Sequence, residues 1–161
     1  MKIPYRIEQI ATKQFAMFPE KFVNGKPVEI KAAHNFGLQK NLSVVRCTTR
    51  VQYFQDQELL MILEVACCFG ISPEGTISIK KERKIPAEFL QYMASIVVGT
   101  ARGIIHAKTA GTVINHIVLP PINLTNVIRD DMLIEKVASD GERTDSKVKS
   151  NKHVANKSIK K

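Results

Sequence analysis

The 161-residue chain lacks several patterns that would assign it to a broad class of proteins. No apolar run reaches the roughly 18 residues that a membrane helix needs, and the N-terminus does not read as a secretory signal. Its three cysteines include the adjacent pair Cys67 and Cys68, which suits neither a disulfide framework nor the spacing of a zinc site. We therefore expect a cytoplasmic protein without membrane insertion, in which the cysteines serve as small apolar side chains.

Motifs of catalysis and cofactor binding are lacking too. No Gly-rich stretch ends in Lys-Ser or Lys-Thr, and Gly99 and Gly103 fall within a helical pattern, which excludes a phosphate-binding or dinucleotide-binding loop. The histidines have no metal-ligand spacing; they are His34, His106, His116 and His153. We expect no cofactor, no metal site and no catalytic residue, so the sequence does not indicate an enzyme.

Acidic residues are missing from the C-terminal end, so most of the net charge of +9 lies there. Residues 146–161 contain six lysines and no acid, so the remaining residues carry a net charge of only +3. Ser and Asn are frequent there and aromatic residues are missing, which predicts a basic, disordered tail over 139–161 behind a folded domain over 1–138. The alternative for this tail is a tether to nucleic acid or to an acidic surface.

Apolar residues make up 44% of the chain, which is enough for a core, and their spacing predicts an α+β fold. Alternation with a period of two predicts four antiparallel strands, with a turn at residues 55–58. We place these strands at residues 3–7, 41–54, 59–71 and 76–80. A helix is predicted from Pro86 to about Thr109. Val113 to Leu119 is expected to be extended, and Asn123 to cap a shorter helix that reaches Val137.

A stripe of small residues follows one side of the long predicted helix: Ser95, Gly99, Gly103 and Ala107, each four residues after the last. A glycine inside a helix costs about 1 kcal/mol relative to alanine, so two of them call for a reason. Small residues on one face let a second backbone come close. The stripe predicts a contact between copies of the chain, and the alternative is glycine without a packing role.

Several short motifs occur in the order found in the SecB family of bacterial chaperones. They are Ile7-Glu8-Gln9-Ile10-Ala11-Thr12-Lys13, Leu63-Glu64-Val65, Ala101-Arg102 and Leu119-Pro120-Pro121-Ile122-Asn123-Leu124. The chain resembles that family over residues 3–135. The resemblance implies a four-stranded antiparallel sheet with a long helix and a shorter C-terminal helix on one side. It also implies a homotetramer, a dimer of dimers, assembled through the long helix.

As a function, the resemblance implies an ATP-independent holdase without a cofactor, which binds unfolded polypeptides or preproteins in exposed apolar grooves. The groove residues matched by motif are Ile30, on a crossover segment, and Ile122, Leu124, Val127 and Ile128 around the last helix. Ordinary core packing is the alternative for each of them, because a groove lining and a core face read alike in sequence.

Glu64 matches one acidic position at which export members of the family dock the translocation motor SecA. The other two such positions here are Gln14 and Phe18, and the chain is basic where export members are acidic. Chaperoning is therefore expected, whereas SecA engagement and a dedicated role, such as guarding the antitoxin of a toxin–antitoxin pair, both stay open. The competing class is a small basic nucleic-acid-binding protein, favoured by Arg46 and Arg50 on one strand face. The predicted strands lack the aromatic pairs that stack on bases, so nucleic acid is not the expected partner.

Overall fold

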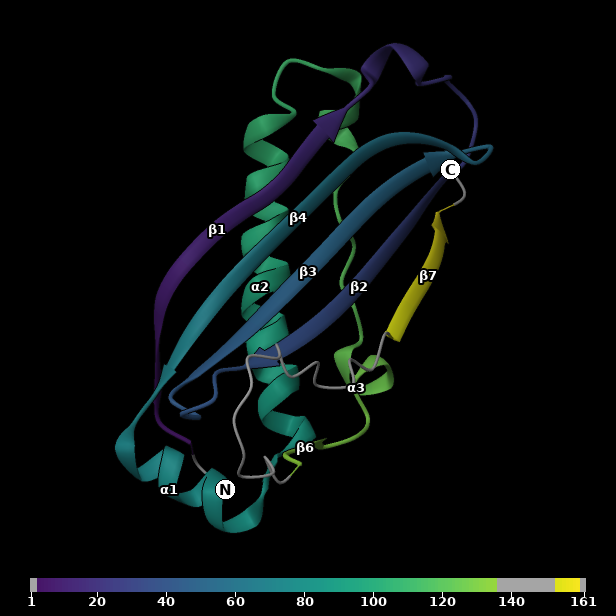
Figure 1. The fold of residues 1–161 in the computed structure, drawn as a ribbon. Helices are drawn as coiled ribbons and strands as arrows, with labels where there is room; N and C mark the ends of the chain where they lie inside the picture. Colours follow the sequence, from purple (N-terminus) through teal and green to yellow (C-terminus); the bar gives the residue numbers. More distant parts are fainter. Residues whose placement is uncertain (1–2, 136–152, 160–161) are drawn as a thin grey trace, which may run out of the picture.

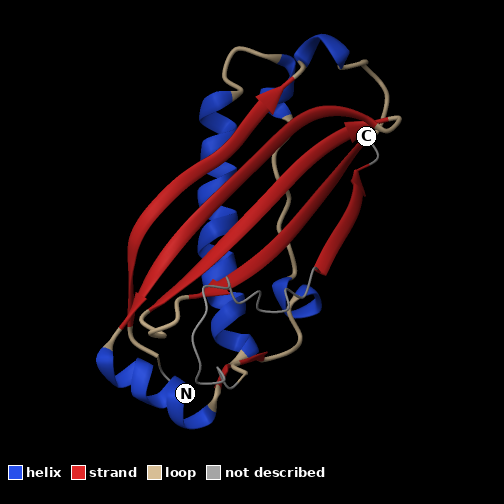
Figure 2. Ribbon diagram, in the orientation of Figure 1, coloured by secondary structure: helices blue, strands red, loops and turns tan. Residues whose placement is uncertain are grey.

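The computed structural model describes residues 3–135 and 153–159, and its centre is an antiparallel β-sheet with a long helix on one face (Figures 1 and 2). The strand order is β1-β4-β3-β2, and a fifth strand, β7, pairs with the outer edge of β2. The strands are β1 (Tyr5–Met17), β2 (Val28–Leu38), β3 (Val44–Gln55), β4 (Glu58–Ile71) and β7 (His153–Ile159). The expected α+β class and the four-stranded antiparallel sheet are confirmed.

The core lies between the sheet and the long helix α2 (Ala87–Lys108), which packs on β3 and β4. We call the sheet face against α2 the covered face and the other the open face. Along β3, apolar side chains on the covered face have no exposed surface, whereas Arg46 and Arg50 on the open face are exposed. The buried set is Val45, Cys47, Val51 and Tyr53. This alternation is the period-two pattern that the sequence predicts for this strand.

A helix stands where the sequence analysis expects a strand. The expected strand at 76–80 lies within α1 (Pro73–Glu82), so this prediction is wrong. The Ser72 hydroxyl oxygen accepts a hydrogen bond from the backbone N of Gly75 at 3.1 Å, and Pro73 takes the first helical position. Both are helix-start signals. Five alternating residues are too few to outweigh them, because so short a pattern does not distinguish a strand from one helical turn.

The fourth strand is instead β2, in the segment that the resemblance treats as a crossover. Its pairing with β3 runs from Glu29↔Phe54 to Leu38↔Val45. Ile30 is therefore a strand residue whose partner is Tyr53 on the covered face, and it is buried.

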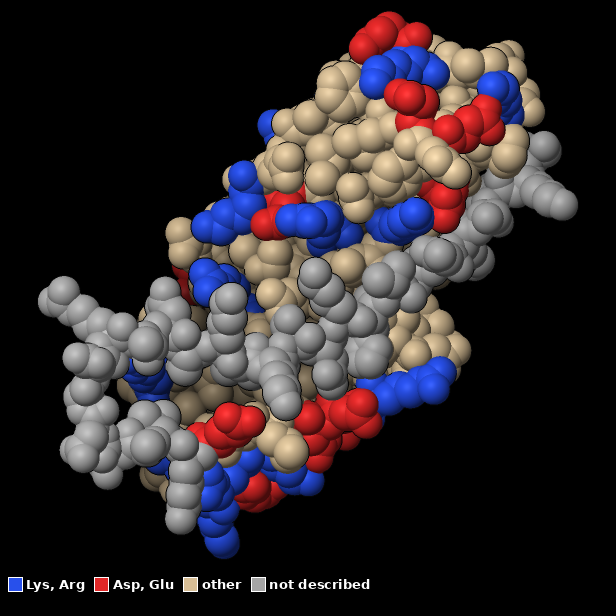
Figure 3. All heavy atoms as spheres, turned by 45° about the vertical axis from the view of Figure 1, so that its right-hand side comes forward, with Lys and Arg blue, Asp and Glu red and all other residues tan. Residues whose placement is uncertain are grey.

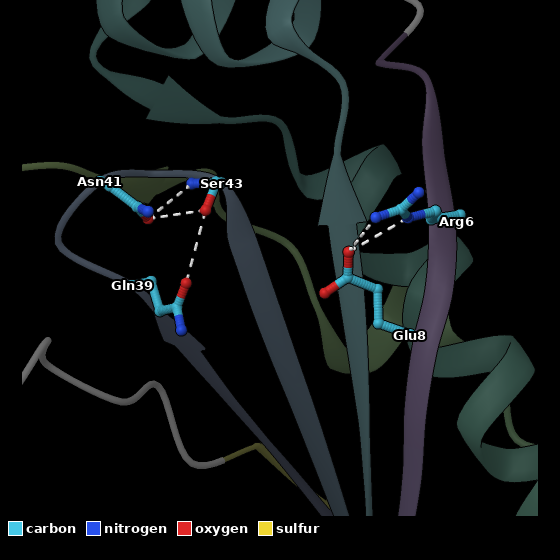
Figure 4. Close-up of polar contacts among 5 residues, drawn as sticks. All are labelled: Arg6, Glu8, Gln39, Asn41 and Ser43. Atoms are coloured by element: carbon cyan, nitrogen blue, oxygen red, sulfur yellow. Dashed lines mark hydrogen bonds and ion pairs between the residues drawn. The ribbon is translucent and has the colours of Figure 1, made fainter.

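Tight turns connect β2, β3 and β4. Asp56 and Gln57 both have positive φ, 47° and 67°, which matches the right-handed twist of a hairpin. The turn expected at residues 55–58 is thus confirmed. In the β2–β3 loop, the backbone N and the hydroxyl of Ser43 both donate to the side-chain oxygen of Asn41, at 3.1 and 2.7 Å (Figure 4).

The N-terminus of α2 is capped by a residue distant in sequence. Pro86 stands at the N-cap and makes no side-chain cap, but Oδ1 of Asp131 accepts a hydrogen bond from the backbone N of Ala87 at 2.8 Å. The other oxygen pairs with Lys84 Nζ at 2.8 Å. The hydrogen bond between these two side chains lowers the pKa of Asp131 and raises the pKa of Lys84. The helix predicted from Asn123 to Val137 would include Asp131, whereas this residue lies outside any helix and caps α2.

The chain after α2 is less regular than predicted. Residues 113–119 are expected to be extended, but the first four form the 3₁₀ helix η2 (Val113–His116), which Thr112 caps. The helix after Asn123 is a single turn, α3 (Leu124–Val127), and does not reach Val137. The next residues serve elsewhere: Asp131 caps α2, and β6 (Met132–Leu133) pairs with β5 (Lys84–Ile85). A longer helix would lose both interactions. A second 3₁₀ turn, η1 (Pro19–Lys21), follows β1.

The predicted tail, 139–161, falls largely outside the described residues, as does the domain end at 138. Within it the structure describes 153–159, and these residues form β7 rather than an irregular segment. Among the described residues, no helix is both long and apolar enough to span a membrane.

Candidate binding surfaces

The small-residue stripe of α2 faces away from the sheet. Ser95, Gly99, Gly103 and Ala107 are all exposed, whereas Met93, Val97 and Ala101 on the opposite side of the helix are buried in the core. A Cβ added at Gly99 or at Gly103 would meet no atom within 4 Å. Packing among the described residues therefore does not require glycine at either position.

Apolar side chains flank this stripe on both sides. The Tyr5 ring contacts Tyr92 at 6.0 Å between centroids, and Lys108 Nζ lies 5.2 Å from the centroid of the Phe15 ring, so α2 runs alongside β1. Two isoleucines on the helix side of β1 are about half exposed: Ile7 at 46% and Ile10 at 54%.

On the other flank, the segment after η2 and the second half of α2 border a half-open pocket of about 350 Å³. Gly99 and Gly103 line it together with Ile117 and Val118, and Val118 is 60% exposed. We call the stripe and its two apolar flanks the α2 trough.

Arg102 fixes the segment between η2 and α3. Its Nε donates to the carbonyl of Leu119 at 2.9 Å, and Nη2 donates to that of Pro120 at 3.4 Å. The Tyr53 hydroxyl donates to the carbonyl of Ile117 at 3.1 Å. Two motifs of the SecB resemblance, Ala-Arg on α2 and Leu-Pro-Pro before α3, are thus brought into direct contact. Sequence reasoning places them on separate elements and misses this clamp.

The five predicted groove residues separate into two sets. Ile30, Val127 and Ile128 are 3%, 8% and 4% exposed and belong to the core, so they do not line an open groove in this structure. Ile122 and Leu124 are only partly buried and pack against that core. A hydrogen bond from Gln91 Nε2 to the carbonyl of Ile128, at 2.8 Å, ties the end of α3 to α2. We call Ile122 and Leu124, with the buried residues beneath them, the α3 surface.

Glu64 lies on the open face of the sheet, where its carboxylate is occupied. Arg50 contacts Oε2 through Nη2 at 2.6 Å and through Nε at 2.8 Å, and the Glu64 side chain is 22% exposed. Its cross-strand partner on β1 is Gln14. Figure 3 shows lysine and arginine side chains next to acidic ones on the visible surface. The predicted docking residue is therefore one half of an ion pair.

Two of the three cysteines, Cys47 and Cys67, are buried and lie opposite each other on β3 and β4. Burial raises the pKa of the Cys47 thiol to about 12 and also raises that of Cys67, so neither thiol is an activated nucleophile. Burial lowers the pKa of His34 to about 4. Its Nδ1 lies 2.9 Å from the Thr49 hydroxyl, while Nε2 has no hydrogen-bond partner in the part of the chain that the structure describes. No group of three possible metal ligands occurs among residues 3–135 and 153–159.

Comparison with known proteins adds no family assignment. The chain matches no protein-family model, and its sequence matches no curated protein significantly. The resemblance to the SecB family therefore depends on the short motifs in the sequence, and the function it implies is a proposal.

Proposed function

We propose that this protein is an ATP-independent chaperone that holds unfolded polypeptides, as its resemblance to the SecB family implies. The observation that carries this proposal is the α3 surface: Ile122 and Leu124 are partly exposed over a buried apolar base. The preceding segment is fixed by hydrogen bonds from Arg102 to two backbone carbonyls. Unfolded chains expose apolar side chains, which such a surface can bind with little sequence preference. Binding the unfolded state delays aggregation by mass action and needs no nucleotide.

The burial pattern decides which substitution tests this proposal. Val127 and Ile128 are core residues, so a charge there would destabilise the domain itself. Leu124→Asp removes apolar surface at a partly exposed position, and Thr125→Asp places the same charge at the exposed neighbour.

We expect Leu124→Asp to lose most suppression of the aggregation of an unfolded client, while Thr125→Asp keeps it. Light scattering of the client measures both, and circular dichroism verifies that each variant is folded. If Leu124→Asp and Thr125→Asp both suppress aggregation as the wild type does, the α3 surface does not bind clients.

As part of this proposal, the chain forms a homotetramer, a dimer of dimers, in which the two dimers pack against each other through their α2 troughs. The trough has a floor of small residues and apolar flanks, and a helix with this outer side can pack against its own symmetry mate. In a tetramer one unfolded client could occupy several binding surfaces and gain affinity through effective concentration.

Gly103→Leu tests the assembly without disturbing the subunit, because the new side chain starts in open space. We expect the native mass, measured by light scattering, to fall from tetramer towards dimer. Gly99→Ala is a milder substitution in the same stripe, because a methyl group adds little bulk. The higher helix propensity of alanine should stabilise the subunit by about 1 kcal/mol. An unchanged mass for Gly103→Leu would reject this interface.

We place the protein in the cytoplasm, where newly made polypeptides are still unfolded. Delivery to SecA is not included in the proposal. Glu64 is engaged by Arg50, and the other two docking positions, Gln14 and Phe18, carry no charge.

A further inference from the structure

The two edges of the sheet differ in how they resist pairing with another strand. At the β1 edge, the register against β4 shifts twice, between Ile7 and Gln9 and between Thr12 and Gln14. Such bulges twist an edge and interrupt its row of backbone donors and acceptors. Charges add to this protection, because Arg6 binds Glu8 at 3.0 Å on the same strand (Figure 4).

The β2 edge has no such interruption. Its pairing with β3 from Glu29 to Leu38 runs without a register shift, so the opposite edge presents a regular row of backbone groups. A regular edge strand is a template for the addition of another strand. This edge therefore needs a cover.

The cover is β7, a segment of the same chain. It pairs antiparallel with β2 from Val28↔Ile159 to His34↔His153, again without a shift. It also contacts α3 and lies on the β2 side of the sheet (Figure 1). An extended polypeptide thus already lies along β2 and beside the α3 surface.

The composition of β7 indicates a weak strand. Its sequence HVANKSI includes Asn, Lys and Ser, which are poorer strand formers than Val or Ile. Backbone pairing, rather than strong β propensity, holds it at β2. A segment of this kind can be displaced by an extended polypeptide that carries more β-branched or aromatic residues.

We propose that the outer edge of β2 is a strand-addition site for extended polypeptide, and that residues 153–159 occupy it as an intramolecular competitor. This inference rests on the proposed chaperone function and gives it a binding mode. The client adds a strand to β2, and its apolar side chains reach the neighbouring α3 surface. Because the competitor belongs to the same chain, its effective concentration is high and only clients that pair better displace it.

Paired proline substitutions in the full chain test this inference. In an antiparallel ladder, alternate residues direct their N–H groups towards the partner strand, and proline removes that donor. Of the double variants Ala155→Pro/Lys157→Pro and Asn156→Pro/Ser158→Pro, one deletes ladder donors and the other deletes outward donors, so each is a control for the other. Hydrogen exchange at the β2 amides 28–34 shows which variant opens the edge.

We expect faster exchange at these amides in the variant that opens the edge. We also expect this variant to bind reduced, carboxymethylated α-lactalbumin about fivefold more tightly than the wild type, because a cover that is in place about 80% of the time leaves about one fifth of the molecules competent to bind. The bound probe should protect the same amides again. Equal exchange in the wild type and both variants would overturn the inference, because β7 would not cover the edge. The inference would also be overturned if the variant with the open edge bound the probe with the same affinity as the wild type. Failure of the chaperone proposal looks different: the probe would bind to none of the three proteins.

Discussion

On the covered face of the sheet, β3 places Val45, Cys47 and Val51 against α2 with no exposed surface, whereas on the open face the same strand places Arg46 and Arg50 in solvent. The two faces differ both in the side chains that β3 directs to them and in what packs over them. The covered face, with its apolar burial, should carry most of the stability, and the open face should tolerate change. The surfaces proposed for partners are the α2 trough, the α3 surface and the outer edge of β2.

Truncating a core side chain of α2 should give the strongest loss of stability. Met93 is fully buried, whereas Ser95, two residues further along α2, is exposed. Met93→Ala should lower the free energy of unfolding by about 2–5 kcal/mol through lost transfer energy and a cavity. Ser95→Ala should change it by no more than about 0.5 kcal/mol. Urea unfolding measures both, and equal losses would contradict the assignment of the two sides of α2.

A smaller effect concerns His34, a buried histidine on the covered face. Burial lowers the pKa of His34 to about 4, below the value of about 6.5 that applies in the unfolded chain. Between these values the unfolded chain binds a proton that the folded chain does not, so stability falls as the pH falls from 6.5 to 4. The loss is up to about 3 kcal/mol, since one pKa unit corresponds to about 1.4 kcal/mol.

Unfolding free energies at pH 7, 5.5 and 4.5 test this prediction. His34→Leu should show a flatter profile than the wild type across this range. If the His34→Leu and wild-type profiles are parallel, the buried imidazole does not set the acid sensitivity.

A still weaker effect is expected for an ion pair on the open face. Arg50 and Glu64 form an ion pair across β3 and β4, but the Arg50 side chain is 52% exposed and water screens the pair. A double-mutant cycle with Arg50→Gln and Glu64→Gln should give a coupling energy below about 1 kcal/mol, and added salt should reduce it. A coupling of several kcal/mol would show that the open face is buried in solution.

The fold could be predicted best where one face is covered along a whole element. The sequence predicts β3 and the length of α2 because their hydrophobic spacing repeats over many residues. It predicts the turn at Asp56 and Gln57 because polar residues interrupt that spacing. In β2 the same alternation is weaker, since small Ala32 and polar His34 stand at buried positions. The sequence pattern therefore does not predict β2, and it wrongly predicts a strand at residues 76–80.

The candidate site was less predictable than the fold. Small residues at four-residue spacing indicate a stripe, and the structure adds that its outward side is open. Apolar residues near α3 do not reveal which of them are core: Val127 is buried, whereas Leu124 is partly exposed. The clamp of Arg102 on Leu119 and the cap from Asp131 to Ala87 join residues distant in sequence, which no local pattern encodes.

Local hydrophobic periodicity specifies the strands of the β3–β4 hairpin, the long helix and the outward stripe of small residues, because this periodicity records which side of an element avoids water. What covers each of these sides depends on tertiary packing. It placed α2 over β3 and β4, buried Ile30 and Val127 in the core, and set β7 against the edge of β2. Burial and edge pairing each require two elements in contact, whereas the pattern of one segment describes only one of these two elements.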